Sequence, residues 1–432
     1  MFHCEENVFT RKWIYFSGHL KGIYGCPEQY SATLSILPDD ILEEILSRLS
    51  VKTLLRFKTV SKSWYNMINN PQFIDMHLQK SRYRNDVKLV IKISSSTLYS
   101  LDPETPNLQV ECTTYPKIFG NNNGDILGSC DGVLCITGHP DGNFMSLLNP
   151  STRQYAVMQY PFPRIQRSFY AHDIAHGLGY DPVTGSYKLV KIVSSCDLRV
   201  HHSEVMIYYF GTSSWVNSQN IWYKSFYPKA GRIVNNYIHW LATSYIVGSS
   251  FSKSVIVAFD LTNESFQEVP LPEAGHDKLL SLNFTELGGC LCIIRNYDIR
   301  FEIWLMTDYR VKDTWTKLFV FVRTSRLQLF AQYFVPLCFT KHGDILLETD
   351  SKFVLCDRKF KRLNELNLVE KYSMAYSEFD EGFIASSLEV IAYVESLAAF
   401  QPNSNNNEVM GPQQIIGRKK RTGENKNKTS SA

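Results

Sequence analysis

The sequence lacks an apolar run of 18 residues, so no segment is long enough to cross a membrane as a helix. It also has almost no excess of charge, because 45 Lys and Arg against 42 Asp and Glu leave a formal net charge of +3. A general nucleic-acid-binding protein carries a basic face. We therefore expect neither a membrane nor nucleic acid among the partners of this chain.

Motifs of known catalytic and metal sites are missing as well. The chain has no G-x-S-x-G nucleophile elbow, no P-loop and no Rossmann glycine fingerprint. His172 and His176 have i, i+4 spacing, but no glutamate lies between them as in H-E-x-x-H. His201 and His202 would point to opposite faces of a strand, and His239 in "YIHWLA" fits a packed strand residue. We expect no metal and no cofactor.

The ten cysteines do not form a disulfide or zinc pattern. Most lie in apolar runs such as "GVLCI" (Cys135) and "FVLCD" (Cys356), which is typical of buried free thiols. Cys290 and Cys292 have C-x-C rather than C-x-x-C spacing and would share one face of a strand. With no signal peptide in view, this usage favours a reducing compartment, and we expect the cytoplasm, the nucleus or both.

What the sequence does contain is a globular composition, with 44% hydrophobic and 20% charged residues. Aromatic residues make up 13%, which favours β-rich structure over a helical bundle. One stretch departs from this trend. "LPDDILEEILSRLSVKTLLRFKTVSKSWYNMI", residues 37–68, has the apolar spacing of helices.

Local signals divide this stretch into three short helices. Pro38 followed by Asp39 and Asp40 indicates a helix start, because proline suits the first turn and acids suit the positive end of the helix dipole. Ser50 and Ser61 are plausible caps for two further helices, and "NNP" (residues 69–71) is expected to end the last one. About 35 residues seldom bury enough surface to fold alone, so another surface should complete this segment.

The same stretch resembles an F-box, in its plant form, along its full length; one departure is Ser50, where the family usually has proline. F-boxes dock on the Skp-family adaptor of a cullin–RING ubiquitin ligase. The resemblance implies that the apolar positions contact the adaptor, and through it the cullin: Leu37, Pro38, Ile41, Ile45, Leu49, Leu54, Leu55, Val60 and Trp64. The alternative is that some of them, Phe57 and Val60 especially, only hold the helices together. Four basic residues give the motif a side suited to an acidic partner or simply to solvent: Lys52, Arg56, Lys58 and Lys62.

After residue 85 the pattern changes to alternating strands broken by turns. A strand–turn–strand segment recurs about every 50 residues, near the kelch period: "TLYSLDPETPNLQVE", "MSLLNPSTRQYAVM", "VMIYYFGTSSWVN", "VIVAFDLTNESFQEVPLP", "IWLMTDYRVKDTWTKLF" and "FVLCDRKFKRLNEL". Between these lie turn-initiated strands such as "SCDGVLCIT" and "NNYIHWLA". Four strands per repeat are what a propeller blade requires, so we predict about six blades; an irregular β-sandwich is the alternative.

Three segments sharpen this prediction: "GLGYDPVTGSYKLVKIV" (177–193), "LLNPSTRQY" (147–155) and "FDLTNESFQEVPLP" (259–272). They resemble the plant F-box-associated, kelch-like domain, which follows the F-box in that family and captures the protein destined for ubiquitination. The predicted organisation is an α+β chain: a flexible N-terminal extension (1–35), an F-box of three helices (36–80), a mainly β, propeller-like domain (85–400) and a disordered basic tail (401–432). The extension could also reflect a start placed too early, and Arg418–Arg421 could be a nuclear import signal or a solvated tail.

We therefore interpret the chain as a non-catalytic substrate receptor of an SCF (Skp–cullin–F-box) ubiquitin ligase. A scaffold acting outside ubiquitination is the alternative, and a kelch-type propeller enzyme is less favoured because it needs converging His, Tyr and Cys ligands. Target contacts are expected in two loops rich in Arg and aromatic residues, "FPRIQRSFY" and "RNYDIRF". The candidate residues are Arg164, Arg167, Phe169, Tyr170, Arg295, Tyr297 and Arg300.

Overall fold

The computed structural model describes the following residues: 38–94, 97–104, 110–114, 125–138, 144–159, 172–195, 202–245, 252–273, 275, 277–322, 334–349, 353–357, 362–366, 389–399 and 409–410. The chain divides into two compact units, Met1–Leu49 and Ser50–Ala432, which are described separately. Within these ranges, no helix combines the length and the apolar character needed to cross a membrane.

The first unit contains one described helix, α2 (Asp39–Leu46). Pro38 occupies the cap position, and Asp39 and Asp40 lie in the first turn, where the helix dipole favours acids. The helix start predicted at Pro38 is therefore confirmed.

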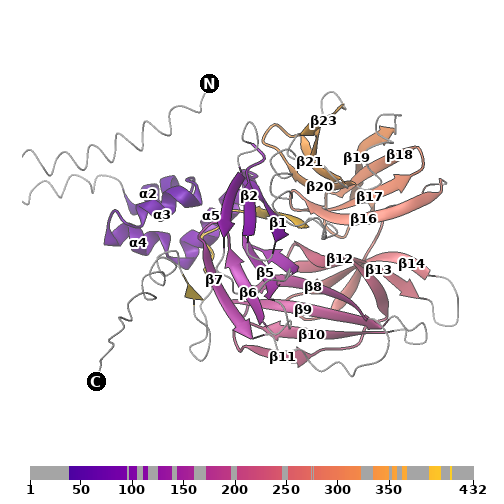
Figure 1. Ribbon diagram of the computed structural model, residues 1–432, viewed down its shortest axis with the longest axis horizontal. Helices are drawn as coiled ribbons and strands as arrows, with labels where there is room; N and C mark the ends of the chain where they lie inside the picture. Colours follow the sequence, from indigo (N-terminus) through magenta and orange to yellow (C-terminus); the bar gives the residue numbers. More distant parts are fainter. Residues whose placement is uncertain are drawn as a thin grey trace, which may run out of the picture. The chain divides into compact units, whose positions relative to one another are not determined.

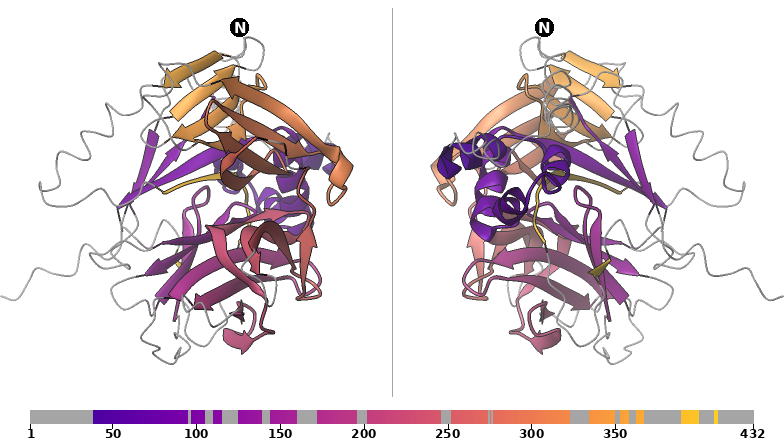
Figure 2. Two further views of the ribbon diagram at one scale, coloured as in Figure 1. Left: turned by 90° about the vertical axis from the view of Figure 1, so that its right-hand side faces the viewer. Right: turned by 90° about the vertical axis from the view of Figure 1, so that its left-hand side faces the viewer.

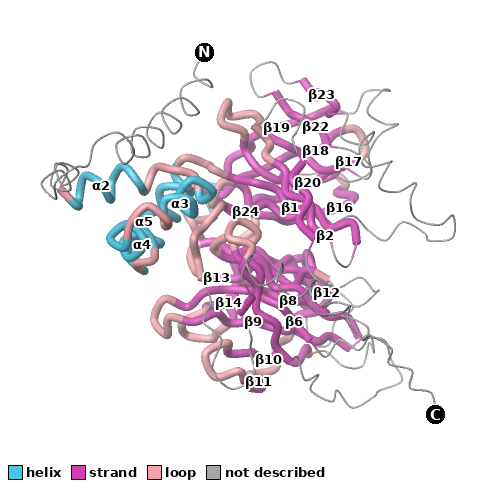
Figure 3. Tube along the Cα trace, turned by 60° about the vertical axis from the view of Figure 1, so that its left-hand side comes forward, coloured by secondary structure: helices cyan, strands magenta, loops and turns pink. Residues whose placement is uncertain are grey.

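The second unit begins with three helices, shown in cyan in Figure 3: α3 (Val51–Phe57), α4 (Lys62–Ile68) and α5 (Pro71–Tyr83). A side-chain oxygen caps each of them by accepting a backbone N–H: Ser50 from Thr53, Ser61 from Trp64 and Asn70 from Gln72. The two serine caps agree with the sequence interpretation. They satisfy N–H groups that have no partner within the helix.

Helix α4 ends at Ile68 with Asn69 as its cap, so "NNP" ends that helix as predicted, but helix α5 corrects the expected number of three helices. Pro71 does not stop the chain from being helical but begins a helix of 13 residues. Proline suits this first position because its missing N–H would have no partner there in any case. Phe73, His77 and Leu78 of α5 are buried, so the helical segment has a fourth helix that the sequence analysis did not predict.

The rest of the second unit is built from strands (Figure 1). We number its four-stranded sheets as blades in the order in which their outer strands occur along the chain. Blade 1 contains β24 (Glu389–Val394), β1 (Val87–Ser94), β2 (Thr97–Leu101) and β3 (Val110–Thr114). Blade 2 contains β4 (Ile126–Cys130), β5 (Val133–Gly138), β6 (Phe144–Asn149) and β7 (Gln154–Gln159). Blade 3 contains β8 (His172–Asp181), β9 (Ser186–Ser195), β10 (Ser203–Tyr209) and β11 (Ser214–Asn217).

Blade 4 contains β12 (Tyr223–Val234), β13 (Tyr237–Tyr245), β14 (Ser252–Asp260) and β15 (Phe266–Val269). Blade 5 contains β16 (Leu279–Leu287), β17 (Cys290–Tyr297), β18 (Arg300–Met306) and β19 (Trp315–Val322). Blade 6 contains β20 (Phe334–Phe339), β21 (Ile345–Thr349), β22 (Phe353–Asp357) and β23 (Arg362–Leu366). The short helix η2 (Lys312–Thr314) precedes β19, and β25 (Val409–Met410) adds to the edge of β7. A parallel bridge from Ala230 to His176 joins blades 3 and 4 into one sheet of eight strands.

The first strands of the blades form a closed ring, because β24, β4, β8, β12, β16 and β20 each contact the next, and β20 contacts β24. Ring closure uses strands from both ends of the propeller. The C-terminal β24 pairs antiparallel with β1, so that residues 389–394 oppose residues 87–92 (Figure 2). The fold is thus a six-bladed propeller, and the β-sandwich alternative is excluded. Each of the six predicted strand–turn–strand segments forms the two outer strands of one blade.

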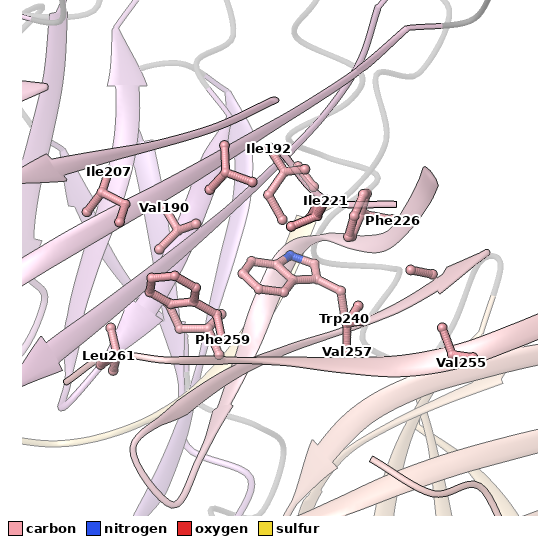
Figure 4. Packing of buried hydrophobic residues seen from close by; sticks show 14 residues of the cluster. Val190, Ile192, Ile207, Ile221, Phe226, Trp240, Val255, Val257, Phe259 and Leu261 are labelled. Atoms are coloured by element: carbon pink, nitrogen blue, oxygen red, sulfur yellow. The ribbon is translucent and has the colours of Figure 1, made fainter. Parts of the chain in front are cut away.

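The core lies between the blades rather than inside any one of them. Six clusters of buried apolar side chains each join two neighbouring blades around the ring. In the cluster between blades 3 and 4, the Trp240 indole is fully buried (Figure 4). Gly177 and Gly231 make room for it, since a Cβ atom at either position would lie 2.7 or 2.5 Å from the ring. Every blade therefore depends on its neighbours for burial.

The "GLGYDPVTGSYKLVKIV" motif forms the β8–β9 hairpin and stabilises the seam between blades 3 and 4. Lys188 is buried and pairs with Asp181 at 2.9 Å and with Glu264 of blade 4 at 2.7 Å. Burial by itself raises the pKa of Asp181, but hydrogen bonds from Lys188, Val183 and Thr184 outweigh it and lower that pKa. This motif has a structural role here, because its charged groups face one another.

Candidate interaction surfaces

Helix α2 exposes two of its large apolar side chains. Ile41 is 46% and Ile45 45% exposed, and Pro38 is also exposed. Leu49, after the helix, is half-buried, and Leu37 lies outside the described residues. Three of the predicted adaptor contacts in this unit are therefore available to a partner.

The helices of the second unit show a similar pattern. Val60, in the turn between α3 and α4, is 58% exposed, and Tyr65 of α4 is 53% exposed. Trp64 is half-buried and packs edge-on against Phe57, with ring centroids 5.1 Å apart. This contact fits the alternative interpretation of Phe57 as a residue that holds the helices together, whereas Val60 faces solvent.

Two further predicted contacts in this unit differ in burial. Leu55 is half-buried, whereas Leu54 is fully buried and has no surface that a partner could reach in this structure. Tyr65 was not among the predicted contacts. Its position in the run "KSWYNMI", next to Trp64, was the signal that could have identified it.

The end of α5 is fixed to the propeller by side-chain contacts. Arg82 forms an ion pair with Asp131, which lies in the β4–β5 turn. Asn85 donates from Nδ2 to the Phe339 carbonyl of blade 6 at 2.7 Å. Asp86 lies 3.5 Å from the Nζ of Lys341. The contacts to blades 2 and 6 indicate that α5 and the propeller are one structural body.

The two loops predicted to bind a target have different outcomes. Arg164, Arg167, Phe169 and Tyr170 lie outside the described residues. In the second loop, Arg295 is only 7% exposed and donates to the carbonyls of Glu273 and Pro272, and its guanidinium stacks on Trp304. In this structure the Arg295 side chain therefore points into the protein and supports the backbone at Pro272 and Glu273.

The other two residues of that loop support its turn. Tyr297 is 4% exposed and carries the guanidinium of Arg300 over its ring, 4.4 Å from the centroid. Arg300 also bonds Asp277 at 2.5 Å and Glu302 at 3.1 Å. Asp298 and Ile299 of this loop reach solvent, and Ile299 has 61% of its surface exposed.

Ile299 belongs to a larger exposed surface that the sequence analysis missed. Five large apolar side chains are exposed in the half of blade 5 that lies away from the β16–β17 turn: Leu279, Leu280, Ile299, Val320 and Val322. We call this surface the apolar end of blade 5. Its signal was "FVFV" at the end of β19, where valines take the exposed positions of the strand.

Two of the described histidines, His239 and His176, are held among packed strands. His239 is fully buried, its Nε2 lies 2.8 Å from the Tyr309 hydroxyl, and burial lowers its pKa to about 4. Burial and the nearby charge of Lys191 lower the pKa of His176 to about 3. Across the described ranges, no three His, Cys, Asp or Glu side chains are grouped so that they could hold a metal ion.

Comparison with known proteins agrees with this geometry. Residues 88–400 match the F-box associated beta propeller domain, and residues 34–75 match the F-box domain. F-box protein CPR1 of Arabidopsis thaliana is 28% identical over 382 residues, which cover 82% of this chain and 89% of CPR1. F-box/kelch-repeat protein At3g23880 of Arabidopsis thaliana is 24% identical over 299 residues, 65% of this chain and 78% of that protein.

Likeness to solved structures is weaker. An oligogalacturonate lyase in complex with manganese is 13% identical with a TM-score of 0.35, covering 62% of this chain and 69% of the lyase. The Dos1 propeller is 12% identical with a TM-score of 0.32, covering 66% of this chain and 68% of that one. The family match, which spans most of the chain, agrees with the six blades and with the apolar helices that precede them. The chain belongs to the plant F-box proteins that carry an F-box-associated β-propeller domain.

Proposed function

We propose that this protein is the substrate-recognition subunit of an SCF ubiquitin ligase. Its helical segment binds a Skp-family adaptor and, through it, a cullin, and its propeller holds a target protein for ubiquitination and degradation. The observation that carries the proposal is that apolar side chains of a matched F-box, Ile41, Ile45 and Val60, are exposed, in a chain whose propeller has a closed core. The proposed setting is the cytoplasm, the nucleus or both.

In this role the protein supplies proximity rather than a catalytic group. A bound target would have its lysines held near the ubiquitin-conjugating enzyme, which replaces a chance encounter by an effectively intramolecular step. The attachment of α5 to blades 2 and 6, through Asp131 and Phe339, supports this role. A fixed spacer keeps the distance between adaptor and target constant.

The first test is a pull-down of the full-length protein with purified Skp-family adaptor, beside a Leu37→Ala/Pro38→Ala double variant. We expect the wild type to bind the adaptor and the variant to lose binding, while thermal unfolding of the propeller is unchanged. A folded wild type that does not bind would contradict the proposal. Unfolding of the whole chain in the variant would contradict the independence of the propeller core.

For the target, we propose the apolar end of blade 5 as the contact surface. Aliphatic side chains shielded from water stabilise a complex by about 1.5–3 kcal/mol each before the entropic cost of association is subtracted. A Leu280→Glu/Ile299→Glu variant should therefore lose target ubiquitination in a reconstituted ligase while it still binds the adaptor. Val311→Glu is the matched control, since Val311 is 48% exposed at the opposite end of the same blade. Equal loss in both variants would argue against this surface.

A further inference from the structure

The propeller encloses a cavity of about 440 Å³ around its axis, at the end where α5 is attached. Residues from β4, β12, β16, β20 and β24 line it, together with Arg82 and Asn85 at the end of α5. All of these elements belong to the second unit. The cavity is large enough to hold a small organic molecule or one long side chain.

The lining of the cavity combines an aliphatic wall with charged side chains. Ile233, Leu337, Ile391 and Val394 contribute apolar side chains from the first strands of the blades. Four charged side chains also line the cavity: Arg82, Asp131, Arg232 and Glu286. A ligand that fits this lining has an apolar stem and a charged or strongly polar head.

The two carboxylates of the lining differ in their partners. Asp131 is neutralised by its ion pair with Arg82. Glu286 receives one hydrogen bond, from the Gly289 N–H to Oε1 at 2.5 Å. Within the described part of the chain, no lysine or arginine nitrogen comes within ion-pair distance of Glu286, and its second oxygen receives no hydrogen bond.

Glu286 is half-buried, and burial raises the pKa of its carboxyl although the Gly289 N–H, Arg232 and Arg82 oppose the shift. Arg232 acts in the same way on Glu348 of blade 6, where burial still raises the pKa to about 7. The attraction of Arg232 is thus shared between two carboxyls and compensates neither of them fully. A half-buried carboxyl in a cavity, with a raised pKa and no ion-pair partner among the described residues, is a candidate binding group.

We propose that the axial cavity binds an organic cation of the alkylguanidinium or alkylammonium class, whose head pairs with Glu286 and whose stem lies along the aliphatic wall. The head would donate to the free Glu286 oxygen, which replaces a solvated carboxylate by a charge-assisted pair. An anion would meet Asp131 and Glu286, while Arg82 is already engaged by Asp131 and Arg232 is attracted by Glu286 and Glu348. A metal ion would need several ligands, which the described residues do not group together.

Two sources share this chemistry, a free small molecule and a basic side chain presented by a protein. The inference does not depend on the ligase role, because the cavity belongs to the propeller itself. Its test uses the full-length protein and two pairs of probes that differ only in charge. Butylguanidinium is compared with the neutral butylurea, and a short peptide with one arginine is compared with its citrulline analogue.

We expect a cationic probe to bind in calorimetry while its neutral analogue does not. In Glu286→Gln, which keeps an oxygen for the Gly289 N–H, binding of the cation should weaken at least about tenfold, or about 1.4 kcal/mol. Glu273→Gln is the control, because the Glu273 side chain is 87% exposed and pairs with Lys312, neither of which lines the cavity. It should leave binding unchanged.

Preference for butylguanidinium would assign the cavity to a free amine or guanidine, and preference for the arginine peptide would assign it to a protein side chain. No binding of either cation at millimolar concentration would overturn the proposal. Equal binding of the cationic and neutral probes would overturn it as well, and so would undiminished binding to Glu286→Gln. The comparison of probes on the wild type remains decisive if that variant does not fold.

Discussion

The helical segment and the propeller use apolar residues in opposite ways. Helices α3 and α4 bury Val51, Leu54 and Ile68, but Tyr65 of α4 and Val60 in the turn between the helices are more than half exposed. Every pair of neighbouring blades, by contrast, shares a buried cluster, and the ring closes on itself. A propeller has no blade without a neighbour, so its apolar faces are all covered from within the chain.

The difference indicates where each region obtains its stability. The propeller is complete without a partner, whereas the helical segment keeps apolar surface that burial would stabilise by about 25 cal/mol per Å². An element that exposes such surface in one protein is commonly completed by another. The proposed adaptor supplies that cover. Four experiments test this difference between the propeller and the helical segment.

The largest effect should come from opening the ring. A chain that ends at Leu388 lacks β24, and with it the buried Val390, Ile391 and Tyr393 and the pairing with β1. The faces of blades 1 and 6 would then be uncovered, so we expect loss of cooperative unfolding and aggregation during purification. Circular dichroism and size-exclusion chromatography measure this.

The matched control for that experiment ends at Phe400. It keeps β24 and the segment after it, in which the carbonyls of Ser396 and Ala398 accept hydrogen bonds from Asn149 of blade 2 at 3.0 and 2.9 Å. This chain should unfold at nearly the temperature of the full-length protein. A stable chain without β24 would show that closure by the C-terminal strand is dispensable.

This dependence on β24 also shows what the sequence could and could not predict. Each outer hairpin is encoded locally, by two apolar strands around a polar turn, and all six were found from their spacing. The pairing of Lys92 with Glu389 has no local signal, because it joins residues from the two ends of the domain. Topology of this kind depends on the closure of the whole ring.

The interaction sites divide in the same way, into features that have a local sequence signal and features that do not. The F-box was recognisable because its short helices carry caps and apolar spacing within one continuous stretch. Helix α5 was missed because Pro71 was interpreted as a stop, although proline also starts helices. In the "RNYDIRF" loop the prediction favoured Arg295 and Tyr297, but β17 is apolar on both faces, so periodicity could not show that these side chains point inward.

The second prediction concerns a buried side chain that lies in the core between two neighbouring blades. Trp240→Ala should lower the free energy of unfolding by about 3–5 kcal/mol, because it leaves a cavity between blades 3 and 4. Chemical denaturation monitored by circular dichroism measures the loss. Trp222→Ala is the control, since Trp222 is 61% exposed and its removal should cost less than about 0.5 kcal/mol. Equal losses would contradict the assignment of the core to the blade interfaces.

The third prediction concerns a charge inside the propeller. The pKa of Glu348 is raised from 4.5 to about 7, so the folded state holds a proton that the unfolded state has released between those values. Stability from this group is therefore fully present below about pH 4.5 and is lost as the pH rises through 7. The loss amounts to at most about 3 kcal/mol.

Glu348→Gln removes this dependence. We expect the variant to equal the wild type in denaturant unfolding at pH 4.5 and to exceed it at pH 8. Glu273→Gln is the control for the loss of one negative charge. Because Glu273 is exposed, the stability difference between this variant and the wild type should be the same at pH 4.5 and at pH 8. A wild-type advantage at pH 8 would mean that Glu348 is compensated in solution and that Arg232 acts on it more strongly than burial does.

The smallest effect should appear in the helical segment, and in binding rather than in folding. Ser61 caps α4 by accepting the Trp64 N–H at 3.2 Å. Ser61→Ala should destabilise that helix by about 1 kcal/mol, which weakens adaptor binding about fivefold. Ser61→Asp keeps a capping oxygen and should bind as the wild type does. Because the propeller core is complete without α4, its melting temperature should stay the same in both variants. A lower melting temperature in Ser61→Ala, with unchanged adaptor affinity, would mean that the helices are completed by the propeller and not by a partner.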